Sequence, residues 1–401
     1  MRVISALFML LCLESCGQQN GDISIGKKQV FYSKLLDENR SIWIYLPRHM
    51  KDPSSAGQRY PVLYLLDADA HFASVAGLVQ QFSEVNGNTL CPEMIVVGIP
   101  NTNRQRDLTP THSGVNTSGG GEIFTSFIGK ELIPHIDSLY PTAPYRIFVG
   151  HSLGGLLVIN ALIHHPQLFN AYLAIDPSMW WDKQVILKQA GTLFAQESFK
   201  GKTLFLAMAN TLPPEMDTAT VRKDTSENTS HIRSIQLLAD ILRKSKGNGL
   251  RWDFKYYTGE THSSVPLISE LDGLRFIFNF YNYKYTNRIY DSSFSAALAL
   301  SSIVDHYKNI SEQMGYEVLP PESHINSLGQ YFLQKKWYEK AYAFFKLNID
   351  NYPKSAWAFE SMGDFYVVTL DKDKAINYFM KSLLLNDNSD AKIKLDKLMG
   401  K

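Results

Sequence analysis

Residues 150–154 read Gly-His-Ser-Leu-Gly and place the hydroxyl of Ser152 between two glycines. An apolar run over residues 145–149 comes before them and a helical stretch over residues 156–163 comes after, so we expect the serine on a sharp strand-to-helix turn. Crowded backbone in such a turn favours glycine at both flanking positions. The turn would aim a helix N-terminus at the hydroxyl, which suits nucleophilic attack on a carbonyl group.

A serine hydroxyl is a poor nucleophile until a base removes its proton, so a histidine must reach Ser152 from another part of the chain. When the serine stands on a turn of this kind, that histidine follows the last strand of the sheet. Residues 252–257 have the pattern of that strand, and the loop after it contains His262. We therefore expect His262 to be the base.

A carboxylate that orients the base is expected in a loop between the serine and the histidine, most often the loop after the strand at residues 203–208. That loop offers Glu215 and Asp217 and, further on, Asp224. The pattern does not rank Glu215 against Asp217, and a dyad without an acid also stays open. Asp176, after the preceding strand, is a less expected position.

The surrounding stretches alternate between strand and helix patterns. Residues 29–36 and 40–46 are typical of a hairpin at a sheet edge. Apolar runs typical of strands buried on both faces occupy residues 61–66, 94–99, 146–149, 172–175, 203–208 and 252–257. The apolar period of helices occupies residues 69–81, 121–139, 155–164, 181–194 and 231–245. This alternation predicts an α/β fold with a mostly parallel central sheet and helices on both faces.

After about residue 286 the pattern becomes purely helical. Gly329 and Gly363 are 34 positions apart, and the alanines and phenylalanines downstream repeat with the same spacing. This period resembles the tetratricopeptide (TPR) repeat. We expect an all-α domain with two such repeats over residues 322–389, a capping helix to residue 401, and a helical connector over residues 286–321. Two repeats bury little surface alone, so we expect them to dock on the first domain, on a second copy or on a protein partner.

Composition excludes some classes of partner. There are 40 Lys and Arg against 39 Asp and Glu, so the net charge of +1 gives no long-range attraction for nucleic acid or an anionic membrane. The three cysteines have no zinc-like spacing with histidine, and we expect neither a metal nor a cofactor.

Residues 1–16 combine a charged start, an apolar run and small residues, which is typical of an export signal. The end of this segment resembles a lipobox in which Cys16 would be lipidated; simple secretion is the alternative. We expect a periplasmic or membrane-anchored protein of a bacterium, with a linker over residues 17–28 and the catalytic domain over residues 29–285.

Four motifs together resemble the esterase D-type α/β-hydrolases, which include siderophore, feruloyl and acetyl esterases. They are Val62-Leu63-Tyr64-Leu65-Leu66-Asp67, Gly150-His151-Ser152-Leu153-Gly154-Gly155, Pro177-Ser178-Met179-Trp180-Trp181 and residues 259–265. The resemblance implies an α/β-hydrolase fold and an oxyanion hole made by the backbone N–H groups of Leu153 and of a residue near Asp69. It also marks Asp176 as an unusual carboxylate, because many relatives have Ser there.

Two further pairs are candidates for substrate binding. Arg104 or Arg106 could hold a substrate carboxylate or catecholate, with pairing of Arg106 to Asp107 as the alternative. Trp180 and Trp181 could wall an acyl or aromatic pocket, with ordinary core packing as the alternative.

These features predict an exported serine esterase that works through a covalent acyl-enzyme. The substrate would be a small-molecule or glycan-linked ester: a siderophore trilactone, a feruloyl or acetyl ester on plant polysaccharide, or another carboxylic ester. The alternatives are a binding scaffold that recruits partners through the repeats and an acyltransferase.

Overall fold

A computed structural model of the chain describes residues 23–51, 57–114, 117–284, 287–386 and 389–400. Within them one sheet of eight strands runs in the order β1-β2-β4-β3-β5-β6-β7-β8. The strands are β1 Lys27–Ser33, β2 Glu38–Tyr45, β3 Tyr60–Leu66, β4 Ile95–Ile99, β5 Thr142–His151, β6 Ala171–Ile175, β7 Thr203–Ala209 and β8 Arg251–Tyr257. The β1–β2 and β2–β4 pairs are antiparallel, and all other pairs are parallel. The mostly parallel sheet predicted from the sequence is therefore confirmed.

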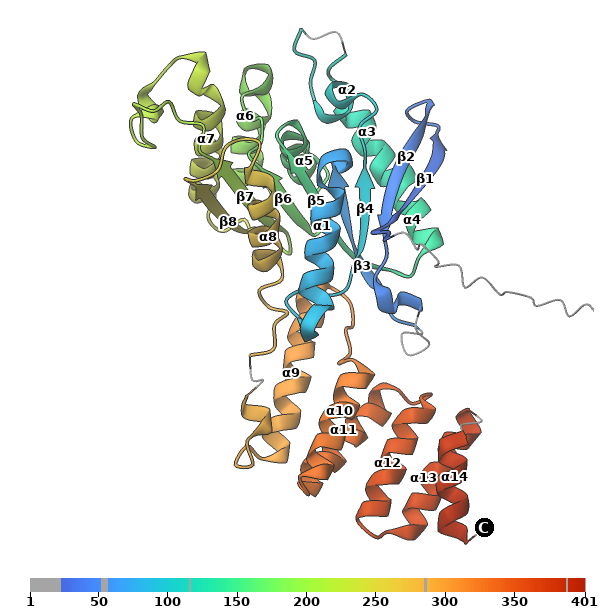
Figure 1. The fold of residues 1–401 in the computed structure, drawn as a ribbon. Coiled ribbons are helices and arrows are strands. Elements are labelled where there is room, and N and C mark those ends of the chain that lie inside the picture. The colour runs from blue at the N-terminus through green and yellow to red at the C-terminus, as the bar shows by residue number, and fades with distance from the viewer. Residues whose placement is uncertain (1–22, 52–56, 115–116, 285–286, 387–388, 401) are drawn as a thin grey trace, which may run out of the picture.

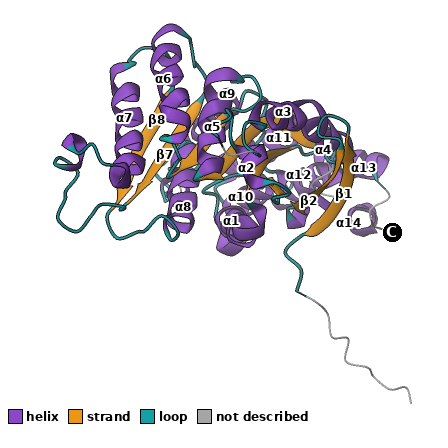
Figure 2. Ribbon diagram, turned by 90° about the horizontal axis from the view of Figure 1, so that it is seen from above, coloured by secondary structure: helices purple, strands orange, loops and turns teal. Residues whose placement is uncertain are grey.

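The helices around the sheet are α1 Ala68–Ser83, α2 Arg104–Leu108, α3 Gly121–Phe127, α4 Ile133–Leu139, α5 Leu153–His164, α6 Trp181–Gln196, α7 Ser230–Lys244 and α8 Val265–Ile277. Helices α1 and α8 cover one face, and α3 to α7 cover the other (Figures 1 and 2). Each set of helices closes its own apolar core against the sheet. Strands β3, β4, β6 and β7 are buried along their whole length, as their continuous apolar runs predict.

The helices differ from the sequence prediction in three places. The helix expected over residues 121–139 is interrupted by a π-helical turn, Ile128–Leu132, between α3 and α4. Helices α2 and α8 were not among the predicted helices, and Pro266 lies in the first turn of α8. Proline is well tolerated in the first turn of a helix, where the missing N–H costs no hydrogen bond.

The C-terminal region is all-α, as predicted. Its helices are α9 Ala296–Met314, α10 Glu322–Gln334, α11 Tyr338–Asn351, α12 Ala356–Val368, α13 Lys372–Leu385 and α14 Ser389–Met399. A Cβ added at Gly329 would lie 2.6 Å from the ring of Phe345, and one at Gly363 would lie 2.6 Å from the ring of Phe379. The 34-residue spacing therefore reflects the same close helix crossing made twice.

Helix α9 joins the two regions (Figure 1). Its early residues Ala299 and Ile303 belong to the core of the helical region, whereas Ile310 and Met314 pack into the core on the α1 and α8 face of the sheet. The predicted signal at residues 1–16, with Cys16, lies outside the described residues. Within the described residues, no helix is both long and apolar enough to cross a membrane.

Candidate active site

Ser152 stands on the turn from β5 into α5. Its backbone has φ 60° and ψ −115°, a conformation that residues with a side chain rarely adopt. Two hydrogen bonds hold it: Ser152 N–H donates to the carbonyl of Ile175 at 2.9 Å, and Ser178 N–H donates to the carbonyl of Ser152 at 3.0 Å. A Cβ at Gly150 would lie 2.5 Å from the backbone of Gly154, so this turn has no room for a side chain there.

His262 lies in the loop after β8 and reaches the serine. Its Nε2 is 3.2 Å from Oγ of Ser152, and its Nδ1 is 2.6 Å from Oδ2 of Asp176. An ionised carboxylate can only accept a hydrogen bond, so Nδ1 carries the proton of the neutral ring and Nε2 is free to accept the serine proton. Three separate segments of the chain thus bring a hydroxyl, an imidazole and a carboxylate together in the order that a proton relay needs.

Asp176 follows β6 in a left-handed conformation, φ 41°, with a fully buried side chain. Its Oδ1 accepts a 2.8 Å hydrogen bond from the N–H of Ala209, and its Oδ2 faces the imidazoles of His231 and His262. Burial alone would raise the pKa of this carboxyl, but the hydrogen bonds from the two imidazoles and from Ala209 together lower the pKa well below its usual range. Asp176 is therefore ionised at neutral pH.

The prediction that this carboxylate comes from the loop after β7 is wrong. Glu215 and Asp217 are both exposed, and Oδ1 of Asp217 accepts hydrogen bonds from the backbone and hydroxyl of Thr220. Asp224 is bonded to nearby hydroxyls. The less expected Asp176 is the one that reaches the imidazole, because β6 is the parallel neighbour of β5 and its end lies beside the serine turn.

Two helix N-termini meet next to the serine. Leu153 is the first residue of α5, and α1 begins one residue after Asp67. A Cβ added at Gly154 would lie 3.2 Å from Oδ2 of Asp67, so the two helix starts lie close together. Because the first N–H groups of a helix have no partner inside it, both starts can offer donors to developing negative charge. The assignment of Leu153 and Asp69 as those donors stays a prediction.

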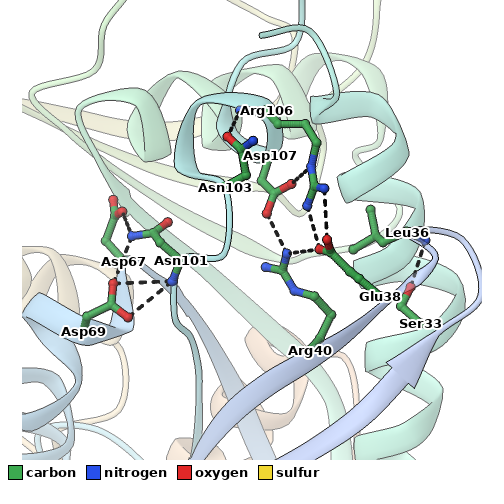
Figure 3. Close-up of polar contacts among 10 residues, drawn as sticks. All are labelled: Ser33, Leu36, Glu38, Arg40, Asp67, Asp69, Asn101, Asn103, Arg106 and Asp107. Atoms are coloured by element: carbon green, nitrogen blue, oxygen red, sulfur yellow. Dashed lines mark hydrogen bonds and ion pairs between the residues drawn. The ribbon is translucent and has the colours of Figure 1, made fainter. Parts of the chain in front are cut away.

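Arg104 ties these two helix starts together. Its Nε and Nη2 lie 2.7 and 3.0 Å from the two carboxylate oxygens of Asp67, and Nη2 also lies 3.3 Å from the carbonyl of His151. Asn101 Nδ2 adds bonds of 2.7 Å to Asp67 and 3.0 Å to Asp69 (Figure 3). Both acidic side chains before and within the first turn of α1 are thus held in place, and Arg104 links that turn to the end of β5.

Arg106 belongs to a cluster of four charged side chains at β2 and α2 (Figure 3). It lies 2.6 Å from Glu38 and 2.7 Å from Asp107, while Arg40 lies 2.7 Å from the other oxygen of Asp107. The hydrogen bond from Arg106 lowers the pKa of Glu38 to about 2, against the opposing effect of burial. The alternative in which Arg106 pairs with Asp107 is therefore the one observed. Arg104 pairs with Asp67 instead, and neither arginine lines the pocket that contains Ser152.

The two adjacent tryptophans have different environments. Trp180 is 40% exposed and lines the same pocket as Ser152, so it is available to a substrate. Trp181 is buried, and its indole N–H donates to the carbonyl of Thr111 at 3.1 Å. Trp180 thus fits the predicted pocket wall, and Trp181 fits the alternative of core packing.

A pocket of about 880 Å³ contains Ser152 and His262. The start of α6 and the segment before α7 form much of its wall, and its other lining residues are Ser178, Trp180, Lys183, Gln184, Thr211, Glu227, Asn228, Ser230 and His231. Asp182, Lys183 and Gln184 have φ values of 43°, 52° and 64°. Three successive left-handed residues with side chains are energetically costly, and such strain is concentrated at functional sites.

His231, at the start of α7, is a member of the site that the sequence did not reveal. Its Nε2 is 2.9 Å from Oδ2 of Asp176, and its Nδ1 accepts a 3.1 Å hydrogen bond from the indole N–H of Trp180. No local pattern marks this residue, because it lies in an amphipathic helix and meets Asp176 only when α7 packs beside β7.

Asp176, His231 and His262 are the one group in the described part of the chain whose spacing could hold a metal ion, with ligand atoms within 4.8 Å of one another. The two facing nitrogens donate to the carboxylate, so an ion would have to replace both protons. That no metal is needed stays a prediction.

Comparison with known proteins points to one family. A family profile described as "Putative esterase" matches residues 33–232. The ferri-bacillibactin esterase BesA of Bacillus subtilis is 29% identical over 60% of this chain and 86% of its own length. An IroE-like serine hydrolase from Shewanella oneidensis is 34% identical, with a TM-score of 0.66 over 80% of this chain and 98% of its own. An uncharacterised protein from Capnocytophaga ochracea, 17% identical, shares the fold over 94% of this chain with a TM-score of 0.62.

Proposed function

The chain belongs to the esterase family of α/β-hydrolases, and on that premise we propose that it hydrolyses carboxylic esters through an acyl-enzyme on Ser152. His262 is the general base and acid, and Asp176 orients it. The observation that carries the proposal is the continuous contact from Ser152 Oγ through both nitrogens of His262 to Asp176.

In the acylation step, His262 Nε2 takes the proton of Ser152 as Oγ attacks the ester carbonyl. The carbonyl oxygen becomes negative beside the N-termini of α5 and α1, and Asp176 stabilises the positive imidazole. His262 then returns the proton to the alkoxide that leaves, so that an alcohol departs and the acyl group remains on Oγ. In deacylation the same histidine takes a proton from water, whose oxygen attacks the acyl carbon, and gives it back to Oγ.

A test uses p-nitrophenyl acetate as a general substrate. We expect turnover by the wild type, and a drop to near background in Ser152→Ala with retained folding by circular dichroism. A fluorophosphonate probe should label the wild-type serine and fail to label Ser152→Ala. Equal activity in wild type and Ser152→Ala would refute the proposal.

For the substrate we propose a siderophore ester. The support is the printed activity of similar proteins, namely the ferri-bacillibactin esterase and the siderophore triacetylfusarinine C esterase of Aspergillus fumigatus, which is 28% identical over 37% of this chain and 54% of its own length. The open pocket with an exposed tryptophan suits a bulky ester. Parallel assays with ferric siderophore, feruloyl and acetyl esters decide among these classes by kcat/KM.

Two other functions stay as alternatives. An acyltransferase would pass the acyl group to an added alcohol at the expense of water, which product analysis detects. A non-catalytic scaffold would leave wild type and Ser152→Ala equally inert while the helical region still captured a partner.

We also propose export of the chain, lipidation at Cys16, and a role in self-association or partner binding for helices α10–α13 as TPR-like repeats. The 34-residue period and the matching contacts of Gly329 and Gly363 support the repeat assignment. Loss of membrane fractionation in Cys16→Ala tests the anchor, and the oligomeric state in light scattering tests self-association.

A further inference from the structure

We propose that His231 is a positioning residue for the ester hydrolysis, holding Asp176 as a second imidazole while Trp180 fixes its proton on Nε2. The inference rests on the proposed function, because it assigns a second partner to the acid of the Ser152 relay. The side chain of His231 connects the exposed Trp180 on the pocket wall to the buried carboxylate of Asp176.

The first step is the shared oxygen. Oδ2 of Asp176 lies 2.6 Å from Nδ1 of His262 and 2.9 Å from Nε2 of His231, and its Oδ1 is taken by the N–H of Ala209. The side chain is fully buried, so these three donors replace the water that would otherwise solvate it. The carboxylate therefore cannot turn away from His262 without losing its bonds to the other two donors.

The second step is the proton of His231. Indole N–H is a donor only, and that of Trp180 lies 3.1 Å from Nδ1 of His231. Nδ1 must then be an acceptor without a proton, so the neutral ring carries its single proton on Nε2, facing Asp176. The contacts with Trp180 and Asp176 thus fix the tautomer of the neutral His231 ring.

A neutral second imidazole has a catalytic consequence. The negative charge of Asp176 stays available to stabilise the imidazolium that forms on His262, whereas a cation at His231 would compensate that charge in advance and repel His262, whose ring centroid is 5.0 Å away. The other titratable groups around these rings are His151 behind His262 and Lys183 and Glu227 on the pocket wall. Burial first, and then the charges of His262 and His71, lower the pKa of His151 to about 4, so it is neutral as well.

The same contacts argue against a metal at this cluster. A metal ion bound to Nε2 of His231 would use the lone pair of Nε2. The lone pair of Nδ1 already accepts the hydrogen bond from the indole N–H of Trp180. The ring would then hold no proton on either nitrogen, which requires an imidazolate. A hydrogen-bonding role is therefore the one that the partners of His231 favour.

The test compares four proteins: wild type, His231→Leu, His231→Gln and Trp180→Phe. His231→Leu removes the donor to Asp176, and we expect kcat to fall about 10- to 100-fold with KM within about two-fold. His231→Gln keeps an amide donor for Asp176 and an acceptor for Trp180, and it should recover most of kcat. Trp180→Phe removes the donor to Nδ1 of His231. We therefore expect kcat of this variant to fall more than that of the wild type as the pH is lowered.

A second measurement determines the tautomer of His231 in the wild-type protein by NMR. The only variant it needs is His231→Gln, in which the signal of His231 disappears and is thereby assigned. With ¹⁵N-labelled histidine, we expect the Nε2–H tautomer of His231 over the whole neutral range. The Nδ1–H tautomer, or full kcat with an unchanged pH profile in His231→Leu, would overturn the inference. So would inhibition by micromolar Zn²⁺ that His231→Gln abolishes. If wild type and Ser152→Ala are equally inactive, the proposed function has failed, and the tautomer measurement still decides the hydrogen bonding of His231.

Discussion

Nε2 of His262 lies 3.2 Å from Oγ of Ser152, although 110 positions of sequence separate the two residues. The distance is within hydrogen-bonding range, and Asp176 holds the other side of the ring at 2.6 Å. The contact joins the end of the fifth strand to the loop after the eighth. It exists because both strands run parallel in one sheet and end at the same edge.

Amide substitutions should show whether Asp176 or the exposed Asp217 is the acid that orients His262. Asp176→Asn puts an amide donor where Nδ1 of His262 needs an acceptor, so the ring is held in the wrong tautomer. We expect kcat for p-nitrophenyl acetate to fall about a thousand-fold or more. Asp217→Asn is the matched control and should keep wild-type kcat, because Asp217 is exposed and bonded to its own turn. A larger effect of Asp217→Asn would restore the loop after β7 as the source of the acid.

The two arginines should respond differently to the same conservative change. Arg104→Lys keeps the positive charge beside Asp67 but loses the two-pronged contact and the bond to the carbonyl of His151. We expect kcat to fall about ten-fold with little change in KM, since the helix starts beside Ser152 lose their link. Arg106→Lys should leave kcat unchanged and lower thermal stability through its contacts with Glu38. If Arg104→Lys raised KM for an anionic ester at constant kcat, the arginine would be a substrate ligand instead.

Glu270 should make the stability of the protein depend on pH. Burial raises its pKa to about 7, against the lowering effect of the hydrogen bond from Ser74. From an ordinary unfolded value of about 4.3 up to about 7, the folded state keeps a proton that the unfolded state has released, so stability falls as pH rises through that window.

Glu270→Gln removes this titration. We expect the variant to exceed the wild type by up to about 3 kcal/mol in free energy of unfolding at pH 8, with little difference at pH 4. Urea denaturation at both pH values measures the effect. A difference that does not change with pH would mean that Glu270 does not titrate in this window.

The glycines at the two helix crossings should be equivalent. In Gly329→Ala and Gly363→Ala the new methyl group would meet an aromatic ring at 2.6 Å, and we expect a loss of about 1–3 kcal/mol in each. Gly77→Ala is the control, because Gly77 lies inside α1 with nothing within 4 Å of an added Cβ, and it should gain about 0.5–1 kcal/mol. Thermal unfolding compares the three. Unequal losses at Gly329 and Gly363 would argue against two copies of one repeat.

Patterns that depend on neighbours in the chain were readable from the sequence. Glycines around Ser152 follow from backbone crowding within a few residues, and the strand and helix periods follow from burial along each element. The position of His262 followed from the order of strands. The 34-residue spacing of Gly329 and Gly363 indicated a repeated helix crossing, and the structure contains this crossing twice.

The tertiary structure decided which polar side chains meet. Asp176 becomes the partner of His262 because a left-handed residue at the end of β6 turns its carboxylate toward the N–H of Ala209 and the imidazole. His231 contacts the same oxygen only because α7 packs beside the sheet. Arg104 contacts Asp67 although 37 positions of sequence separate them. The path of a loop and the packing angle of a helix depend on contacts far apart in the chain, so residue spacing could not determine them.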